Sequence, residues 1–164
     1  MKPEIKIPQC GFGFDSHAFS SQGTLVFGGL RFPGVPALAG HSDGDALLHA
    51  LIDALLGAAG LGDIGELFPD SNKKIKGISS LIMLKQVMKK IKQAGFAPYH
   101  IDITVVAQKP RLSSVKKKLS QLISKVLSVS ITHVNIKGKT PEGLTWFVPQ
   151  GGIAVWAVAT VISQ

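Results

Sequence analysis

The sequence predicts an α+β fold, an α/β sandwich in which helices pack on one face of a mixed β-sheet in a ferredoxin-like arrangement. Strand-like and helix-like segments are interleaved along the chain, and one strand-like stretch has the pattern of a hairpin. The 164 residues, 45% of them hydrophobic, suit one domain (1–164) that buries its own core.

Strand-like segments lie in both halves of the chain. Residues 5–15 combine apolar residues with glycines and predict a strand. Residues 24–32 predict a short hairpin that turns at Gly28 and Gly29, and residues 33–40 then read as a loop. Apolar and β-branched residues predict further strands over 100–108, 134–137 and 152–162.

Three segments have helical patterns. Residues 45–60 are apolar on most of their surface and end in a glycine, which predicts a buried helix. Apolar residues and lysines recur at helical spacing over 81–93 and 112–127, which predicts two amphipathic helices. Residues 62–77 are rich in Asp, Lys and Gly and predict an irregular polar stretch.

The chain is basic, with a formal net charge of +8, and most of the excess lies between Lys73 and Lys139. Nucleic acid, an anionic membrane surface or a small polyanion such as a nucleotide would suit this charge, and a solvated basic face is the alternative. No apolar stretch is long enough to span a bilayer, and the first residues lack an apolar targeting segment. The one cysteine, Cys10, fits a reducing cytoplasm, and we expect it to be a small buried residue.

Histidines and carboxylates recur at spacings that suit a metal ion. Asp15 and His17 lie two apart in a strand-like segment, so their side chains would point to the same side. With His49 they would supply three ligands of the type that Zn²⁺ takes, and a fourth position would stay open for water or substrate. Asp53, one helical turn from His49, would orient an imidazole. The alternative is a hydrogen-bonded core histidine and two acidic residues used in caps or ion pairs.

Two other stretches suit phosphate. HSDGD, residues 41–45, precedes the apolar helix; Ser42 or Asp43 is the expected N-cap, and free amides there would attract an anion. In KGKTPEG, residues 137–143, Lys139, Thr140 and Glu142 combine a cation, a hydroxyl and a carboxylate, a mixture that suits a phosphate with bound Mg²⁺, although an ordinary turn also explains it.

Together these motifs resemble a known family. GFDSHAF (13–19), the block from His41 to Asp70, IKGIS (75–79) and TPEGL (140–144) are similar to the 2-C-methyl-D-erythritol 2,4-cyclodiphosphate synthases of the non-mevalonate isoprenoid pathway. The resemblance implies a cytoplasmic homotrimer with active sites between subunits. It also implies a phosphorus–oxygen lyase that converts 4-diphosphocytidyl-2-C-methyl-D-erythritol 2-phosphate to the cyclic diphosphate and releases CMP.

The resemblance also implies roles for individual residues. The implied ligands of one Zn²⁺ per subunit are Asp15, His17 and His49, and the implied ligand of a substrate-bound Mg²⁺ or Mn²⁺ is Glu142. The implied transition-state stabilisers are His41 and Thr140. The implied pocket for the erythritol phosphate is Ser42, Asp63, Ile64, Gly65, Phe68 and Asp70. The implied cytosine segment, from the adjacent subunit, is 107–113, with Ala107, Pro110, Arg111, Leu112 and Ser113. Lys139, from its place beside Thr140 and Glu142, is a further substrate-binding candidate.

The chain departs from the family pattern in three places. Lys139 replaces a usual Thr, and Arg111 replaces a common Lys. Residues 146–152 read WFVPQGG where many members read FTGRGEG, so the Arg and Glu of a subsite on the trimer axis are missing. We therefore expect the reaction without that regulatory site. The alternatives are a metal-dependent phosphohydrolase that uses the same triad and a basic nucleic-acid-binding protein; we expect no nucleic-acid and no membrane partner.

Overall fold

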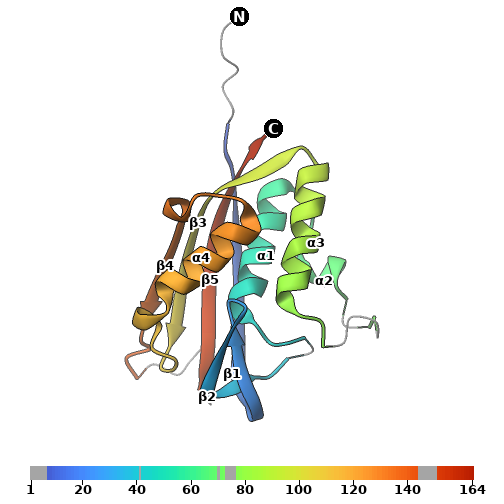
Figure 1. The fold of residues 1–164 in the computed structure, drawn as a ribbon. Coiled ribbons are helices and arrows are strands. Elements are labelled where there is room, and N and C mark those ends of the chain that lie inside the picture. The colour runs from blue at the N-terminus through green and yellow to red at the C-terminus, as the bar shows by residue number, and fades with distance from the viewer. Residues whose placement is uncertain (1–6, 41, 70, 73–76, 144–150) are drawn as a thin grey trace, which may run out of the picture.

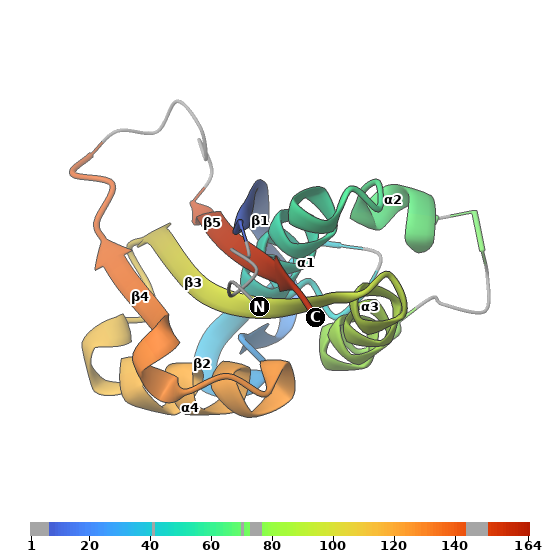
Figure 2. The same cartoon turned by 90° about the horizontal axis from the view of Figure 1, so that it is seen from above.

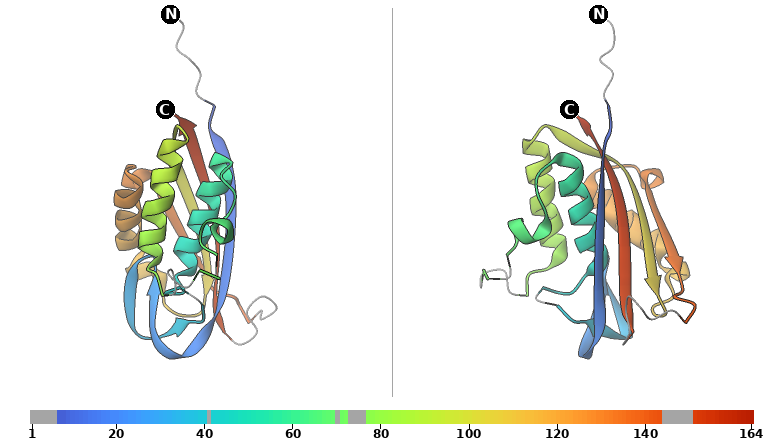
Figure 3. Two further views of the ribbon diagram at one scale, coloured as in Figure 1. Left: turned by 90° about the vertical axis from the view of Figure 1, so that its right-hand side faces the viewer. Right: turned by 180° about the vertical axis from the view of Figure 1, so that it is seen from behind.

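The computed structural model describes residues 7–40, 42–69, 71–72, 77–143 and 151–164. Within these residues, five strands form one sheet, and helices cover one of its faces (Figure 1, Figure 3). The strands are β1 (Gln9–Phe27), β2 (Leu30–Leu38), β3 (Phe96–Ala107), β4 (Val134–Lys139) and β5 (Gly152–Ser163). The α-helices are α1 (Ala46–Ala59), α2 (Ile64–Leu67), α3 (Ser80–Gln93) and α4 (Lys116–Leu127).

The sheet is mixed, with the strand order β2-β1-β5-β3-β4. β1 is antiparallel to β2 and to β5, β5 is antiparallel to β3, and β3 is parallel to β4. β1 and β3 thus form a split β-α-β unit with β5 inserted between them, which a ferredoxin-like arrangement shares. The parallel β3–β4 pair, connected through α4, departs from that arrangement. The predicted α+β class and mixed sheet are confirmed.

The hairpin turn lies where the sequence predicts it, but the strands on both sides are longer. Gly28 and Gly29 have φ angles of 58° and 77°, the left-handed region that a tight hairpin turn requires. The loop predicted over 33–40 is wrong, because β2 continues to Leu38. β2 lies at the edge of the sheet, where Pro33 and Pro36 need not donate to a second neighbour.

The helix predictions are confirmed with shifted ends. α1 ends at Gly60, which adopts φ 67° as a left-handed C-cap. Its N-cap is Asp45, so the expectation of Ser42 or Asp43 in that role is wrong. The stretch predicted as irregular contains the short helix α2, and α4 begins at Lys116 after a 3-10 turn.

The core forms where α1 lies directly against β1 and β5 (Figure 2). Gly11 and Gly13 of β1 face the helix, and a Cβ atom at either position would lie 2.0 Å from a backbone oxygen, that of Ala54 or Ala50. No side chain therefore separates the two backbones. On the same face, β3 and β5 contribute buried residues that alternate along each strand.

The opposite face of the sheet carries exposed apolar side chains. Phe12 and Phe14 of β1 and Val158 of β5 are 64%, 44% and 37% exposed. Cys10 shares their side of β1, so it is exposed rather than buried as predicted. Within the described residues, no helix covers this face (Figure 3). In the same part of the chain, no helix has both the length and the apolar character needed to cross a membrane.

The contact between β1 and α1 predicts a strong effect of Gly13→Ala. The added methyl group would meet helix backbone that cannot rotate away, so we expect a loss of about 3 kcal/mol in the free energy of unfolding. Urea unfolding measures it. The matched control is Gly57→Ala, in α1, where nothing lies within 4 Å of the added Cβ. We expect this substitution to raise the free energy of unfolding by about 0.5–1 kcal/mol. Equal stabilities of the two variants would contradict this packing.

Candidate functional site

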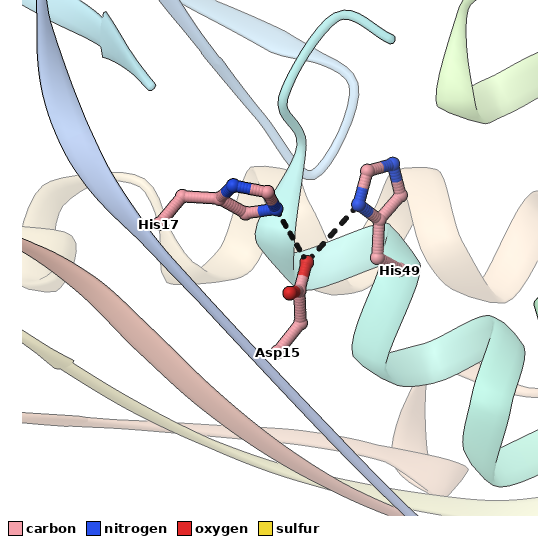
Figure 4. A group of neighbouring side chains, drawn as sticks. All are labelled: Asp15, His17 and His49. Atoms are coloured by element: carbon pink, nitrogen blue, oxygen red, sulfur yellow. Dashed lines mark hydrogen bonds and ion pairs between the residues drawn. The ribbon is translucent and has the colours of Figure 1, made fainter. Parts of the chain in front are cut away.

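Asp15, His17 and His49 converge beside the N-terminal half of α1 (Figure 4). His17 Nε2 and His49 Nδ1 each lie 3.0 Å from Asp15 Oδ2. The side chains are 21%, 23% and 13% exposed, in the order Asp15, His17, His49, so the cluster is largely shielded from solvent but not closed. The structure thus brings together the three residues that their sequence spacing singled out.

The fold explains why these side chains meet. Residues two apart in a strand share a face, so Asp15 and His17 follow Gly11 and Gly13 on the side of β1 that faces α1. His49 lies on the first turns of α1. Because the two backbones are in direct contact, an imidazole on the helix reaches a carboxylate on the strand.

The two histidines keep Asp15 ionised. Burial raises the pKa of Asp15, but hydrogen bonds and positive charge from His17 and His49 outweigh it and lower the pKa to about 2. The hydrogen bond with Asp15 raises the pKa of His17, against the effect of burial. The cluster thus holds an anionic oxygen between two imidazole nitrogens at neutral pH.

The donor set fits a divalent metal ion. The three ligand atoms lie within 4.8 Å of one another, and among the described residues this is the one group of three such side chains. Imidazole nitrogen and carboxylate oxygen are ligands of zinc, and three protein ligands leave a position open, as catalytic zinc sites do. These three residues could therefore hold a metal ion.

Asp53 does not orient an imidazole, which corrects the sequence prediction. Its Oδ1 accepts a hydrogen bond from the backbone N–H of Ile64 at 2.8 Å and so ties α1 to α2. Burial raises the pKa of Asp53. The outer nitrogen of His49, Nε2, instead lies 2.9 Å from Ser80 Oγ and 3.1 Å from Ser42 Oγ.

Ser80, the first residue of α3, is absent from the sequence prediction. Its side chain is fully buried and also donates to Asp43 Oδ1. The sequence signal for such a role is a pair of serines, Ser79 and Ser80, before a predicted helix. One serine is enough for the N-cap, so the second is available for another contact. Ser79 occupies the cap position, and the second serine turns inward.

Asp45 fastens the hairpin turn to the start of α1. Its fully buried carboxylate accepts hydrogen bonds from the backbone N–H groups of Gly28, Gly29 and Leu48 at 2.8, 2.7 and 3.2 Å. Burial is the largest influence and raises the pKa of Asp45 to about 6, although the three donors oppose it. This clamp fixes the backbone just before His49.

The predicted erythritol-phosphate segment forms a short helix beside α1. Asp63 is the N-cap of α2, and its Oδ1 accepts from Glu66 N at 2.8 Å, which leaves Oδ2 for other contacts. Ile64 is half-buried and Gly65 exposed, whereas Phe68 is buried in the core. His41 and Asp70 lie outside the described residues.

A second cluster lines a pocket of about 690 Å³ at the ends of β3 and β4. Thr140 Oγ1 donates to Glu142 Oε1, and Glu142 adopts the left-handed region with φ 48°. Lys116, a cation that the sequence analysis did not single out, also lines the pocket because it begins α4. The predicted residues in its lining are Ala107, Pro110, Arg111, Leu112, Ser113, Lys139, Thr140 and Glu142.

The pocket and the triad lie on different strands of the same sheet. β5 and β3 stand between β1 and β4, and strands lie about 4.8 Å apart, so β1 and β4 are separated by about 14 Å. Register pairs His17 with Ile153 and Ile153 with Ala107, so both clusters lie toward the same end of the sheet.

The fold and these clusters define an α+β protein with a candidate metal centre and a separate cationic pocket. The chain belongs to the YgbB family, whose model matches residues 9–162. The family resemblance seen in the sequence motifs is confirmed.

Named relatives agree over nearly the whole chain. The 2-C-methyl-D-erythritol 2,4-cyclodiphosphate synthase of Gemmatimonas aurantiaca is 44% identical over 153 residues, which are 93% of this chain and 92% of the relative. The bifunctional IspDF structure from Campylobacter jejuni matches with a TM-score of 0.91 and 38% identity over 98% of this chain, but only 43% of that longer chain. A 2C-methyl-D-erythritol-2,4-cyclodiphosphate synthase structure in a CDP-bound form matches with a TM-score of 0.85 and 32% identity, over 93% and 99% of the two chains.

The Asp45 clamp predicts a pH-dependent stability that Asp45→Asn removes. The folded pKa of about 6 lies above the ordinary 3.8, so the native state holds the extra proton. Stability from this group is therefore present below about pH 4 and lost as the pH rises to about 6, by about 3 kcal/mol. Urea unfolding of both proteins from pH 4 to about 7 measures the difference between them. Parallel pH curves for the two proteins would contradict it.

Proposed function

We propose that this protein converts 4-diphosphocytidyl-2-C-methyl-D-erythritol 2-phosphate to 2-C-methyl-D-erythritol 2,4-cyclodiphosphate and CMP, a step of the non-mevalonate isoprenoid pathway. The observation that carries the proposal is the convergence of Asp15, His17 and His49 on one point, in a chain of the YgbB family. The named relatives carry the same activity in their names.

The proposal assigns roles to both clusters. Asp15, His17 and His49 would hold Zn²⁺, and Glu142 would hold Mg²⁺ or Mn²⁺ together with the substrate diphosphate. When bound, these ions would supply positive charge that neutralises the phosphates and polarises the phosphorus under attack. The remaining residues bind the substrate, orient it and donate hydrogen bonds.

The reaction is an internal phosphoryl transfer. An oxygen of the 2-phosphate forms a bond to the β-phosphorus of the cytidine diphosphate group, and the bond from that phosphorus to the bridging oxygen breaks. CMP leaves with the bridging oxygen and its electron pair. The attacking phosphate is already anionic, so no residue need act as a base, and positioning supplies most of the acceleration.

Residues of the chain suit these tasks. Lys139, Arg111 and Lys116 line the pocket and would reduce the repulsion among three phosphoryl groups. The Thr140 hydroxyl and His41 would donate to the charge that develops during transfer. The segment 107–113 would hold cytosine, and Ser42, Asp63, Ile64, Gly65, Phe68 and Asp70 would hold the erythritol phosphate, partly through backbone groups.

We also propose a homotrimer in which each site uses two subunits. The triad and the pocket of one chain are separated by two strands, so a neighbouring chain that supplies the pocket residues would complete the site. The exposed apolar face around Phe12, Phe14 and Val158 is a surface that such an assembly would bury. Most of the segment that departs from the family pattern, residues 146–150, lies outside the described residues. The loss of the subsite on the trimer axis therefore stays a prediction.

Two alternatives are less well supported. A phosphohydrolase would use the same triad with water as the nucleophile and would give a linear product. A nucleic-acid-binding protein would use the lysines of α3 and α4, but the relative from Gemmatimonas aurantiaca is named as a synthase. We keep the cytoplasm as the proposed location, because Cys10 has no second cysteine to pair with.

The first test is a product assay. Purified protein with the cytidyl substrate and Mg²⁺ or Mn²⁺ should yield CMP and a coupled pair of cyclic-diphosphate signals in ³¹P NMR spectra. CMP with a linear phosphate product would favour the hydrolase. Steeply salt-dependent binding of oligonucleotides, without CMP formation, would favour the nucleic-acid reading.

His49→Ala should remove zinc binding and activity together, because one of three ligands is lost. Metal analysis after gel filtration, alongside the product assay, measures both. Lys90→Ala, in the last turn of α3, is the control and should keep both properties. A His49→Ala protein with one zinc per subunit would refute the ligand assignment.

Glu142→Gln should raise the Mg²⁺ or Mn²⁺ concentration required for activity, since an amide is a weaker ligand than a carboxylate. Zinc content should stay at the wild-type level, because Glu142 belongs to the pocket and not to the triad. Titration of each ion against CMP release tests the assignment, and an unchanged titration midpoint would exclude this role.

A further inference from the structure

The His49 ring is held at both of its nitrogens. Nδ1 faces Asp15 Oδ2 at 3.0 Å, within the proposed zinc site. Nε2, on the other side of the ring, lies 2.9 Å from the hydroxyl oxygen of Ser80 and 3.1 Å from that of Ser42. The direction of the hydrogen bonds at Nε2 therefore decides which nitrogen is free to bind a metal.

The hydrogen of the Ser80 hydroxyl is already used. Ser80 Oγ donates to Asp43 Oδ1, and the backbone N–H of Ser80 donates to Asp43 Oδ2 at 3.0 Å. Both carboxylate oxygens of Asp43 thus accept hydrogen bonds from Ser80. A hydroxyl has a single hydrogen, and an ionised carboxylate only accepts, so Ser80 Oγ has only lone pairs left for His49.

The Nε2 atom of His49 must therefore carry a proton and donate it to Ser80. An unprotonated Nε2 would set its lone pair against the lone pairs of Ser80 Oγ at 2.9 Å. Ser80 is fully buried, so water cannot relieve that repulsion. Ser42 Oγ, which accepts from Gly44 N at 3.2 Å, can share the Nε2 proton as a second acceptor.

We infer that Ser80 and Asp43 hold the proton of His49 on Nε2, so that Nδ1, which donates to Asp15 here, is the nitrogen that gives up its proton and binds the metal. This inference rests on the proposed function, because it concerns how a residue behind a zinc ligand acts. Ser80 is a positioning residue, because it contacts His49 and Asp43 and is not one of the three proposed metal ligands. Histidine ligands of metals commonly donate their second N–H in this way, and the loss of the acceptor weakens metal binding.

Zinc affinity tests the inference directly. Competition with a chelator should show that Ser80→Ala binds zinc about 10- to 100-fold more weakly than the wild type. The matched control is Ser124→Ala, which also removes a buried helical hydroxyl, here one that donates to Gln121 O, and should bind zinc as the wild type does.

Asp43→Asn separates the tautomer from packing, since Ser80 stays in place. The amide group would accept from Ser80 N and donate to Ser80 Oγ, which frees the hydroxyl to donate to Nε2 and favours the wrong tautomer. Zinc affinity should fall in this variant too. Wild-type affinity in both Ser80→Ala and Asp43→Asn would overturn the inference, and wild-type affinity in Asp43→Asn alone would reduce Ser80 to a packing role and overturn it as well.

The proton can also be located in the wild-type protein loaded with zinc, which needs no variant. Long-range ¹H–¹⁵N spectra of ¹⁵N-histidine protein should show the His49 proton on Nε2, slow to exchange, and the metal on Nδ1. Coordination through Nε2 would overturn the inference while leaving a zinc enzyme intact. A wild-type protein that bound no zinc would overturn the proposed metal site and this inference together.

Discussion

The direct contact between the backbones of β1 and α1 is the constraint on which the rest of the structure depends. Gly11 and Gly13 leave no side chain between strand and helix, and the alanines of α1 that face them are small. The helix therefore lies closer to β1 than a helix packed through large side chains. Because the two backbones are so close, the short side chain of Asp15, two residues beyond Gly13 on the same face of β1, reaches His49 on α1.

Around this contact, buried polar groups fasten the loops. Asp45 holds the hairpin turn, Asp53 holds the start of α2, and the Asp43–Ser80 pair holds the start of α3. Each carboxylate accepts from backbone N–H groups, which a hydrophobic side chain cannot replace. Asp43, Asp45 and Asp53 thus stabilise the connections around α1. Of these acidic residues and Asp15, only Asp15 belongs to the candidate metal site.

Sequence patterns predicted what depends on local spacing. The two-residue alternation of a strand predicts that Asp15 and His17 share one face, and the apolar composition around His49 predicts a buried helix. Contacts between segments distant in sequence cannot be predicted from local spacing. Ser80 meets His49 from another helix. Helical spacing pairs Asp53 with His49, but in the structure Asp53 accepts from the backbone N–H of Ile64, eleven residues further on. Cys10 and the loop predicted over 33–40 failed for a similar reason, since exposure and edge position belong to the whole sheet.

The central place of β5 has a consequence for how the chain folds. This strand pairs with β1 on one side and β3 on the other, and its register joins Gln9 to Val161. The other described helices and strands precede β5 in the sequence, so β1 and β3 emerge from the ribosome without the strand that lies between them. Contacts so distant in sequence close slowly. Until β5 is in place, the apolar surface of α1 that β5 covers stays exposed, and transiently exposed surface of this kind favours aggregation unless chaperones protect it.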